Sequence, residues 1–293
     1  MYTLDFALQI LANGIVIGSV YVLVALGLTL IFGILGIVNF AHGEFYMLGA
    51  YFGITAAALY GLSLFPLLLV GILGVVLVGL ACERLVFRPL GNQDMTGSII
   101  TSFGLAVALQ NAALIAFGPQ PKLLRTPWAN IPVEIGPVFM PLQRALIPVI
   151  ALVLVVAVHV VLRHTWTGRS LRAMAQHATL AQLYGVDVKR VAVVTFAVGA
   201  ALAGGAGVLM SSVFLVQPTV GNMIALKAFT VVILGGMGNV YGAVAAGLLL
   251  GVAETFVAGY VSNALRDIVG FALVVAVLLV RPQGLFGRAL DRA

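Results

Sequence analysis

The sequence predicts an all-α protein, a polytopic membrane helical bundle with about eight or nine membrane segments. Of the 293 residues, 62% are hydrophobic and only 8% are charged, and the mean hydropathy is +1.17. A soluble protein of this length could not bury so much apolar surface. Several windows also run for about 18 or more residues without a charge, which is the length needed to cross the hydrocarbon core of a bilayer.

A series of apolar segments follows along the chain, and each is expected to form a helix. Their expected bounds are Leu8–Phe32, Glu44–Leu59, Pro66–Phe87, Thr96–Phe117, Ala145–Leu162, Val191–Ser212, Asn222–Leu234, Val240–Ala258 and Asn263–Val280. We treat the chain as a single transmembrane domain. Its expected parts are a first half (1–118), an outer loop with a bridging helix (119–163), a cytoplasmic loop (164–190) and a second half (191–293).

Basic residues predict which loops face the cytoplasm, because Lys and Arg concentrate on that side of a membrane protein. They flank the connection after the third segment, lie between the fifth and sixth segments, and follow the last one. These residues are Arg84, Arg88, Arg163, Arg169, Arg172, Lys189, Arg190, Arg281, Arg288 and Arg292. The proline-rich connection Gly118–Arg144 and the N-terminus are then expected outside. The net charge of +6 is explained by these loops, so no nucleic-acid partner is expected.

The second and seventh segments are short, and each follows a stretch with helix-breaking character. These stretches are GILGIVNFAHG (33–43) and VFLVQPTVG (213–221). A helix broken inside the membrane must satisfy its freed backbone groups against protein or in a water-lined cavity. The first four and the last four segments are therefore expected to form an inverted repeat with short interrupted helices. Paired interruptions of this kind point to a translocation path near the midplane.

Asn39, His42 and Glu44 are candidates for the path or its gate, because ionisable groups in a membrane usually face the bundle interior or water. Two interpretations remain open. Asn39 or His42 could cap the second helix, with Glu44 favourably placed near its N-terminus. Alternatively, the three residues line or gate a path for a polar solute. Gly43 suits both interpretations, since glycine permits a sharp turn or a close approach between helices.

Lys227 is the fourth candidate, and it lies as early in the seventh segment as Glu44 lies in the second. The two residues could form a salt bridge that locks the halves together, or they could belong to the path. Glu254 is expected to pair with a nearby polar group or to reach the outer interface.

Two glycine-rich stretches have structural interpretations. GAALAGGAG (199–207) carries small residues at spacings of four, which favours close packing between helices. GGMGNVYG (235–242) does not match the GxGxxG fingerprint of nucleotide-binding proteins and is expected to form a tight turn between the seventh and eighth segments.

The loop TWTGRSLRAMAQHATLAQLYGVDVKRV (165–191) is expected to contain a short helix at about Leu180–Tyr184. Thr179 with Gln182 three residues later fits a capping box, and Gly185 fits a C-cap. A helix of this kind in a cytoplasmic loop would present its side chains beside the membrane.

The apolar side chains of that helix, Leu180, Leu183 and Tyr184, would be poorly placed in open cytosol. They should pack either on the transmembrane bundle or into a groove of a cytoplasmic partner. Arg169 and Arg172 could tether the same partner.

The sequence carries no pattern for catalysis, and no cofactor or metal is expected on this chain. A Walker A motif requires a glycine directly before its lysine, and none of Lys122, Lys189 and Lys227 follows a glycine. The protein is therefore not expected to be an enzyme or to hydrolyse ATP itself.

Three stretches resemble the permease subunits of branched-chain amino acid ABC importers. They are Asn13–Gly53, the loop GRSLRAMAQHATLAQLYGVDVKRV with FAVGAALAGGAGVL after it, and Lys227–Gly251. In length the chain is similar to the smaller of the two permease types. The residues that match the first signature are Asn39, His42 and Glu44, and those that match the ATPase-coupling loop are Gly168, Arg169, Arg172 and Gly185. QHATLAQ departs from the family, which more often has an acidic residue near His177.

The resemblance implies a multi-pass subunit of a heteromeric importer in the bacterial inner membrane. Its partners would be a second homologous permease, two cytoplasmic ATP-binding subunits that use the ATP, a periplasmic substrate-binding protein and membrane lipid. Leucine, isoleucine and valine would be the default substrates, while relatives carry urea, amides or aromatic acids. The alternative is a stand-alone ion-coupled secondary transporter or channel for a small polar solute, with Glu44, His42 and Lys227 as a relay.

Overall fold

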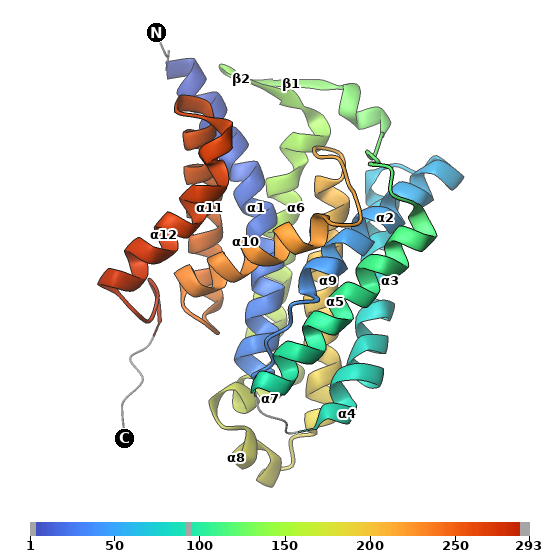
Figure 1. Cartoon of the computed structure of the whole chain (residues 1–293), viewed down its shortest axis with the longest axis vertical. Helices are drawn as coiled ribbons and strands as arrows, with labels where there is room; N and C mark the ends of the chain where they lie inside the picture. Colours follow the sequence, from blue (N-terminus) through green and yellow to red (C-terminus); the bar gives the residue numbers. More distant parts are fainter. Residues whose placement is uncertain (1–3, 92–94, 288–293) are drawn as a thin grey trace.

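The computed structural model describes residues 4–91 and 95–287, and helices form most of it (Figure 1). The helices are α1 (Leu4–Leu35), α2 (His42–Tyr60), α3 (Leu64–Cys82), α4 (Arg88–Leu90), α5 (Met95–Phe117), α6 (Leu142–His164), α7 (Trp166–Gln176), α8 (Ala178–Leu183), α9 (Val188–Met210), α10 (Val220–Gly235), α11 (Val240–Tyr260) and α12 (Arg266–Val280). A π-helical turn, Glu83–Phe87, joins α3 to α4. Short 3-10 turns lie at Pro127–Asn130 and Asn263–Leu265.

The predicted helical membrane bundle is confirmed. In the described part of the chain, 7 helices are long and apolar enough to cross a membrane, counting α3 with α4 and α12 with the turn before it. Two further membrane segments are shorter or more polar: α2 has 19 residues and α10 has 16. The outer connection also forms a hairpin that the sequence did not predict, in which β1 (Pro132–Ile135) pairs antiparallel with β2 (Val138–Pro141).

The two ends of the bundle carry different connections. The start of α1 and the β1–β2 hairpin lie at one end, while α4, α7 and α8 lie at the other (Figure 1). The basic residues of the first two predicted cytoplasmic regions, on α4 and the turn before it and from the end of α6 to the start of α9, therefore gather at the α7–α8 end. Arg281 follows α12, and Arg288 and Arg292 lie outside the described residues. This separation is the one that the distribution of Lys and Arg predicts.

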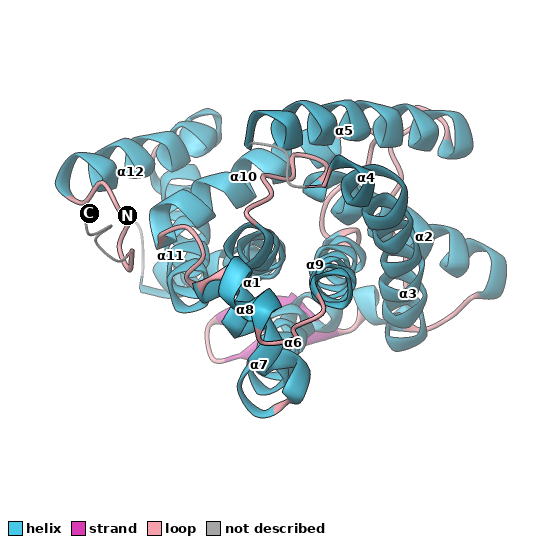
Figure 2. Cartoon of the chain, turned by 90° about the horizontal axis from the view of Figure 1, so that it is seen from below, coloured by secondary structure: helices cyan, strands magenta, loops and turns pink. Residues whose placement is uncertain are grey.

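Helix packing repeats in the two halves with the direction reversed. In this repeat α1, α2 and α3 of the first half correspond to α9, α10 and α11 of the second. The packing of α1 on α11 therefore matches that of α9 on α3, and the packing of α2 on α9 matches that of α10 on α1. α1 runs away from the hairpin end, whereas α9 runs toward it (Figure 1). Viewed from the α7–α8 end, α1 and α9 lie at the centre, with α5 and α10 on one side and α6 and α7 on the other (Figure 2). This is the inverted repeat that the short segments predicted.

Both interrupted segments find partners for their backbone. The break after α1 begins at Gly36, whose φ of 68° suits glycine. Within this break, the Phe40 N–H donates to Ser102 Oγ of α5 at 3.1 Å, and the same hydroxyl lies 3.1 Å from the Val38 carbonyl. In the second half, Val216 and Lys122 exchange two backbone hydrogen bonds of 2.7 and 2.9 Å. These backbone N–H and C=O groups of the extended segments therefore find hydrogen-bond partners within the protein.

The glycine-rich run in α9 lies where helices approach most closely, as predicted. A Cβ on Gly207 would overlap the Tyr46 carbonyl, and one on Gly204 would meet Val75 of α3 at 2.9 Å. The tight turn expected between α10 and α11 is also present, with Gly236 and Gly238 at φ of 97° and 80°. Small residues thus set the distances between the central helices.

Candidate translocation site and coupling loop

Asn39 and His42 are buried where the extended segment enters α2. Asn39 Oδ1 accepts a hydrogen bond from the Ala41 N–H at 3.1 Å, and His42 Nε2 lies 3.1 Å from the Val24 carbonyl of α1. Because a carbonyl only accepts, Nε2 carries the proton and Nδ1 offers a lone pair. Within the described structure, His42 Nδ1 and Asn39 Nδ2 have no hydrogen-bond partner.

The predicted cap of α2 by Asn39 or His42 is wrong. The helix begins at His42, two residues before the expected start, and its N-cap residue is Ala41, which makes no side-chain cap bond. The His42 ring reaches across to α1 instead, so it joins two helices rather than closing the end of one.

Glu44 is buried in the first turn of α2 and lies against the first turn of α10. Its carboxylate occupies the space that a Cβ on Gly221 would need. The carboxylate therefore lies beside two helix N-termini, where the partial positive charge of the helix dipole stabilises an anion. Oε2 has no hydrogen-bond partner among the described residues.

Gly43 serves the close approach between helices and not the turn. It lies within α2, and a Cβ on it would overlap the Gly221 carbonyl and meet Ala225 Cβ at 2.9 Å. The chain turns earlier, at Gly36. The two short helices therefore cross with backbone against backbone at Gly43 and Gly221.

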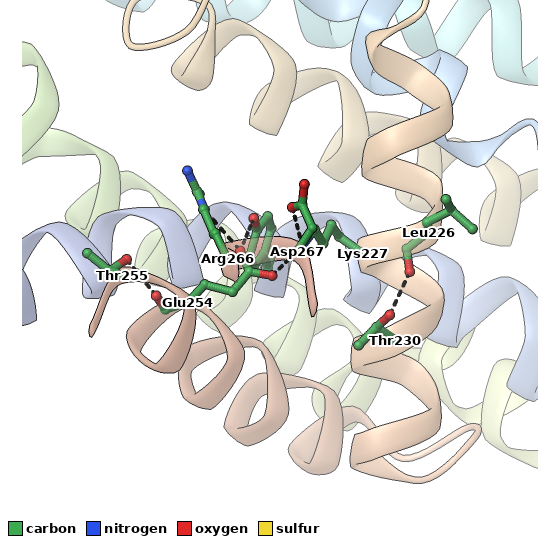
Figure 3. A network of polar contacts seen from close by, with 9 residues as sticks. Leu226, Lys227, Thr230, Glu254, Thr255, Arg266 and Asp267 are labelled. Atoms are coloured by element: carbon green, nitrogen blue, oxygen red, sulfur yellow. Dashed lines mark hydrogen bonds and ion pairs between the residues drawn. The ribbon is translucent and has the colours of Figure 1, made fainter. Parts of the chain in front are cut away.

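Lys227 does not pair with Glu44, so the predicted salt bridge between the halves is wrong. Its Nζ lies 2.5 Å from Glu254 Oε1 and 2.9 Å from Asp267 Oδ1 (Figure 3). Lys227 lies midway along α10 and faces α11 and α12, while Glu44 lies against the N-terminal turn of α10. The charge of Lys227 is thus compensated within the second half.

The cluster around Lys227 also includes Tyr21 and Arg266, and Glu254 lies at its centre, fully buried. The Tyr21 hydroxyl donates to Glu254 Oε2 at 2.8 Å, and Arg266 Nε donates to the same oxygen at 3.3 Å. The cluster of Tyr21, Lys227, Glu254, Arg266 and Asp267 joins α1, α10, α11 and α12. Its two cations balance its two carboxylates, as charges in a membrane require.

A polar pair on one outer face of the bundle was not predicted. Asn222 Nδ2 of α10 donates to Gln110 Oε1 of α5 at 3.1 Å. Asn222 is exposed beside exposed apolar residues such as Met223 and Leu226. A polar group on an apolar helix was the available signal, but the sequence does not show that the two helices meet.

The loop after α6 forms two helices where one was expected. α7 begins after Thr165, whose side chain accepts from the Gly168 N–H at 3.0 Å. A Cβ on Gly168 would overlap the carbonyls of Val161 and Leu162, so only glycine lets the chain turn this tightly from α6 into α7. The buried face of α7, which includes Leu171 and Met174, packs on α1 and α9.

α8 is the short helix that was predicted, but its cap differs. It covers Ala178–Leu183, and His177 Nδ1 accepts from the Leu180 N–H at 3.4 Å. The capping box of Thr179 and Gln182 is therefore wrong. Gly185 ends the helix with a φ of 84°, as expected.

The apolar side chains of this region point away from the bundle. Leu180 is 48% exposed, Leu183 78% and Tyr184 88%. The Arg169 guanidinium stacks 3.7 Å from the Trp166 ring, and the Arg172 side chain donates to the Leu162 carbonyl. We call the exposed side chains of Leu180, Leu183 and Tyr184 the α8 patch.

These features define a polytopic membrane transport subunit: an inverted helical repeat with buried polar groups at its interrupted helices and an apolar patch outside the bundle. A family model described as "Branched-chain amino acid transport system / permease component" matches residues 10–278. The chain belongs to this family and is a multi-pass protein of the inner membrane.

Relatives with established names agree with this assignment. The chain is 36% identical to the high-affinity branched-chain amino acid transport system permease protein LivH of Salmonella typhimurium, covering 97% of this chain and 96% of that protein. It is 35% identical to the corresponding protein BraD of Pseudomonas aeruginosa, covering 96% of both. Against LivM of Escherichia coli the identity is 27%, over 91% of this chain and 67% of LivM. The chain is thus of the smaller, LivH type.

Among solved structures, PsaBC from Streptococcus pneumoniae in complex with Fab is similar, with a TM-score of 0.54 over 96% of this chain and 93% of that one. The sequence identity is only 12%, so this likeness concerns the fold alone.

Proposed function

We propose that this chain is one of two homologous permease subunits of an ABC importer and forms half of the path for leucine, isoleucine or valine. The family match and the names of the relatives support this substrate class. The weaker similarity to LivM, a different permease, supports a related second subunit as the other half of the path.

The α8 patch is the observation that carries the coupling part of the proposal. It lies at the end with the basic loops, and the sequence has no Walker A motif with which to use ATP itself. Apolar side chains that neither the bundle nor lipid covers fit a groove on a protein partner. We infer that two ATP-binding subunits hydrolyse the ATP and that one of them binds the α8 patch.

The path is proposed to run along the face that α5 and α10 share. Gln110 and Asn222 lie on this face, and polar groups at membrane depth favour water or a protein partner over lipid. Asn39, His42 and Glu44 are proposed to line or gate the path where α2 and α10 cross. A periplasmic binding protein would deliver the substrate at the hairpin end.

The alternative of a stand-alone ion-coupled carrier has less support. Its relay needs Lys227 together with Glu44 and His42, but Lys227 pairs with Glu254 and Asp267. A lone carrier also has no use for the α8 patch.

The coupling assignment can be tested with Leu183→Asp and Tyr184→Asp. Each substitution places a charge in the proposed apolar contact, so ATP-binding subunits should no longer co-purify with the permease, while membrane insertion stays normal. Ile135→Asp is the matched control, because Ile135 is 62% exposed on the hairpin at the opposite end. Retained ATP-binding subunits with normal amino-acid uptake in both variants would refute the assignment.

A further inference from the structure

A cavity of about 460 Å³ lies between α1, α6, α7 and the start of α11. Its polar lining includes His159, Arg163, Arg172 and Tyr241, and the rest of its wall is mainly apolar. Of the helices that line it, α6 and α7 lie on the side of the bundle away from α5 and α10 (Figure 2). The path that we propose along α5 and α10 therefore does not include it.

A second cavity, of about 170 Å³, continues the first on the other side of α6. Its lining is almost wholly apolar, and the two cavities share Leu30, Ile34, Leu162 and Leu171. Val153, Val156 and Val160 on the outer face of α6 are 61%, 50% and 46% exposed. Both cavities thus flank a helix that faces lipid along much of its length.

The mouth of the larger cavity carries uncompensated positive charge. The sequence has no Asp or Glu between Glu134 and Asp187, and in the described part of the chain neither Arg163 nor Arg172 forms an ion pair. The wall also holds Thr29, whose buried hydroxyl has no hydrogen-bond partner in the described structure. Two arginines that line one cavity can bind a phosphate through several charge-assisted hydrogen bonds.

The position and the lining together select the kind of ligand. A soluble anion would have no use for the apolar walls, and a cytoplasmic protein could not reach the cavity on the far side of α6. Basic pockets between membrane helices on the cytoplasmic side bind anionic lipid head groups. Trp166, 77% exposed at the start of α7, is typical of a side chain at the membrane interface.

We propose that these cavities bind an anionic phospholipid of the cytoplasmic leaflet. Its phosphate would lie between Arg163 and Arg172, and its acyl chains would fill the apolar spaces on the two sides of α6. Arg172 also donates to the Leu162 carbonyl, so the bound lipid would hold α7 against the end of α6. α7 leads directly into the α8 patch, which gives the lipid influence over the position of the coupling loop.

The proposal is tested by native mass spectrometry of the purified full-length permease, titrated with phosphatidylglycerol or with phosphatidylcholine of the same acyl chains. Phosphatidylglycerol should bind preferentially. Arg163→Gln and Arg172→Gln should each weaken it about fivefold, and the double variant about 25-fold, because one basic residue near a membrane surface contributes about 1 kcal/mol. Arg84→Gln removes an exposed arginine outside the cavity at the same end and should change nothing.

A second variant tests the acyl-chain site without altering charge. Ala157→Trp would fill the smaller cavity and should also weaken binding of phosphatidylglycerol, while Val156→Trp on the adjoining lipid-facing position should not. Equal binding of both lipids, an equal loss in Arg84→Gln, or displacement of phosphatidylglycerol by inorganic phosphate would overturn the proposal. It would also be overturned if the two arginine variants released ATP-binding subunits but kept the lipid.

Discussion

At the scale of single residues, Gly43 and Gly221 determine how closely α2 and α10 cross. Neither position has space for a methyl group, because the Cβ of an alanine would overlap backbone or the Glu44 carboxylate. At Gly43 the overlap is with backbone, so no side-chain rotation relieves it; at Gly221 it is with the Glu44 carboxyl group, which would have to leave its buried position. The crossing therefore depends on glycine at Gly43, and glycine at Gly221 leaves room for Glu44.

Gly43→Ala and Gly221→Ala should each lower the free energy of unfolding by about 1–3 kcal/mol, the usual effect of overpacking a core. Gly104→Ala is the control, since no atom lies within 4 Å of a Cβ there. It should be neutral or stabilising by up to about 1 kcal/mol, as alanine favours a helix. Thermal unfolding of the purified variants in detergent makes the comparison, and equal stability of all three would contradict this role.

Glu44→Gln should reduce amino-acid uptake severalfold, because it removes the negative charge that the start of α10 faces at the helix crossing. His42→Ala should do the same, since it removes the side-chain bond by which α2 is held to the Val24 carbonyl of α1. Uptake into cells or proteoliposomes is measured, with membrane insertion checked separately. Glu134→Gln, on the exposed hairpin, serves as the control. Normal uptake in both test variants would leave the two residues with a structural role only.

The sequence identifies the rare charges of the apolar segments but not their partners. Lys227 and Glu254 stand out in their segments, yet their pairing depends on the rotation and depth of α10 and α11, which a single sequence does not specify. The same holds for Glu44, whose neighbour is the backbone of a glycine. The predicted salt bridge between Glu44 and Lys227 was based on their equivalent positions in the repeat, and it is wrong.

At the scale of elements, the charged cluster around Glu254 fixes α10 to its neighbours. Glu254 accepts from three side chains that come from α1, α10 and α12. Removal of one cation would leave the buried carboxylate only partly compensated. Such a loss is more damaging than replacement of both partners by neutral groups.

Lys227→Met should therefore destabilise the protein by about 3–5 kcal/mol, and the added change Glu254→Gln should restore part of that loss. Lys189→Met, at the exposed start of α9, is the matched control and should have little effect. Chemical unfolding of the wild type, Lys227→Met, Glu254→Gln and the double variant gives the coupling energy. Strictly additive effects of the two substitutions would show that the pair does not act as a unit.

Helices were predicted well where apolar segments were long, and less well elsewhere. α7 was missed because an amphipathic helix of 11 residues in a loop has no long apolar run. The hairpin was missed because its strands have only four residues each and include Pro132 and Pro141, which argue against a strand. In α8, the helix was expected but its cap was not, since His177 is a less common cap than Thr179.

At the scale of the whole molecule, loop charge and hydropathy were enough to predict the segments and the separation of the two ends. The repeat, too, followed from two short segments. What could not be predicted is the face on which α5 meets α10, because the contact between Gln110 and Asn222 depends on the packing of elements far apart in the chain.

The orientation can be tested with single cysteines in a Cys82→Ser background, since Cys82 is the one cysteine of the chain. Ile135→Cys should react with a membrane-impermeant maleimide on cells whose outer membrane has been made permeable to the reagent. Arg84→Cys should react only after the inner membrane is opened. Both side chains are exposed and lie outside the α8 patch, so access to the reagent and not burial decides the result. The reverse pattern would invert the assigned topology.

The contact of Gly43 with Gly221 also has a mechanical consequence. It lies at one end of α10, a helix of 16 residues and therefore about 24 Å long. Since backbone lies against backbone there, a small rotation about the contact moves few side-chain atoms near it apart from the Glu44 carboxyl group. A tilt of about 10° would nevertheless displace the other end of α10, at Gly235, by about 4 Å. A pivot of α10 at this crossing would thus move its C-terminal end most, and that end is directed toward the side from which ATP hydrolysis is proposed to drive the transporter.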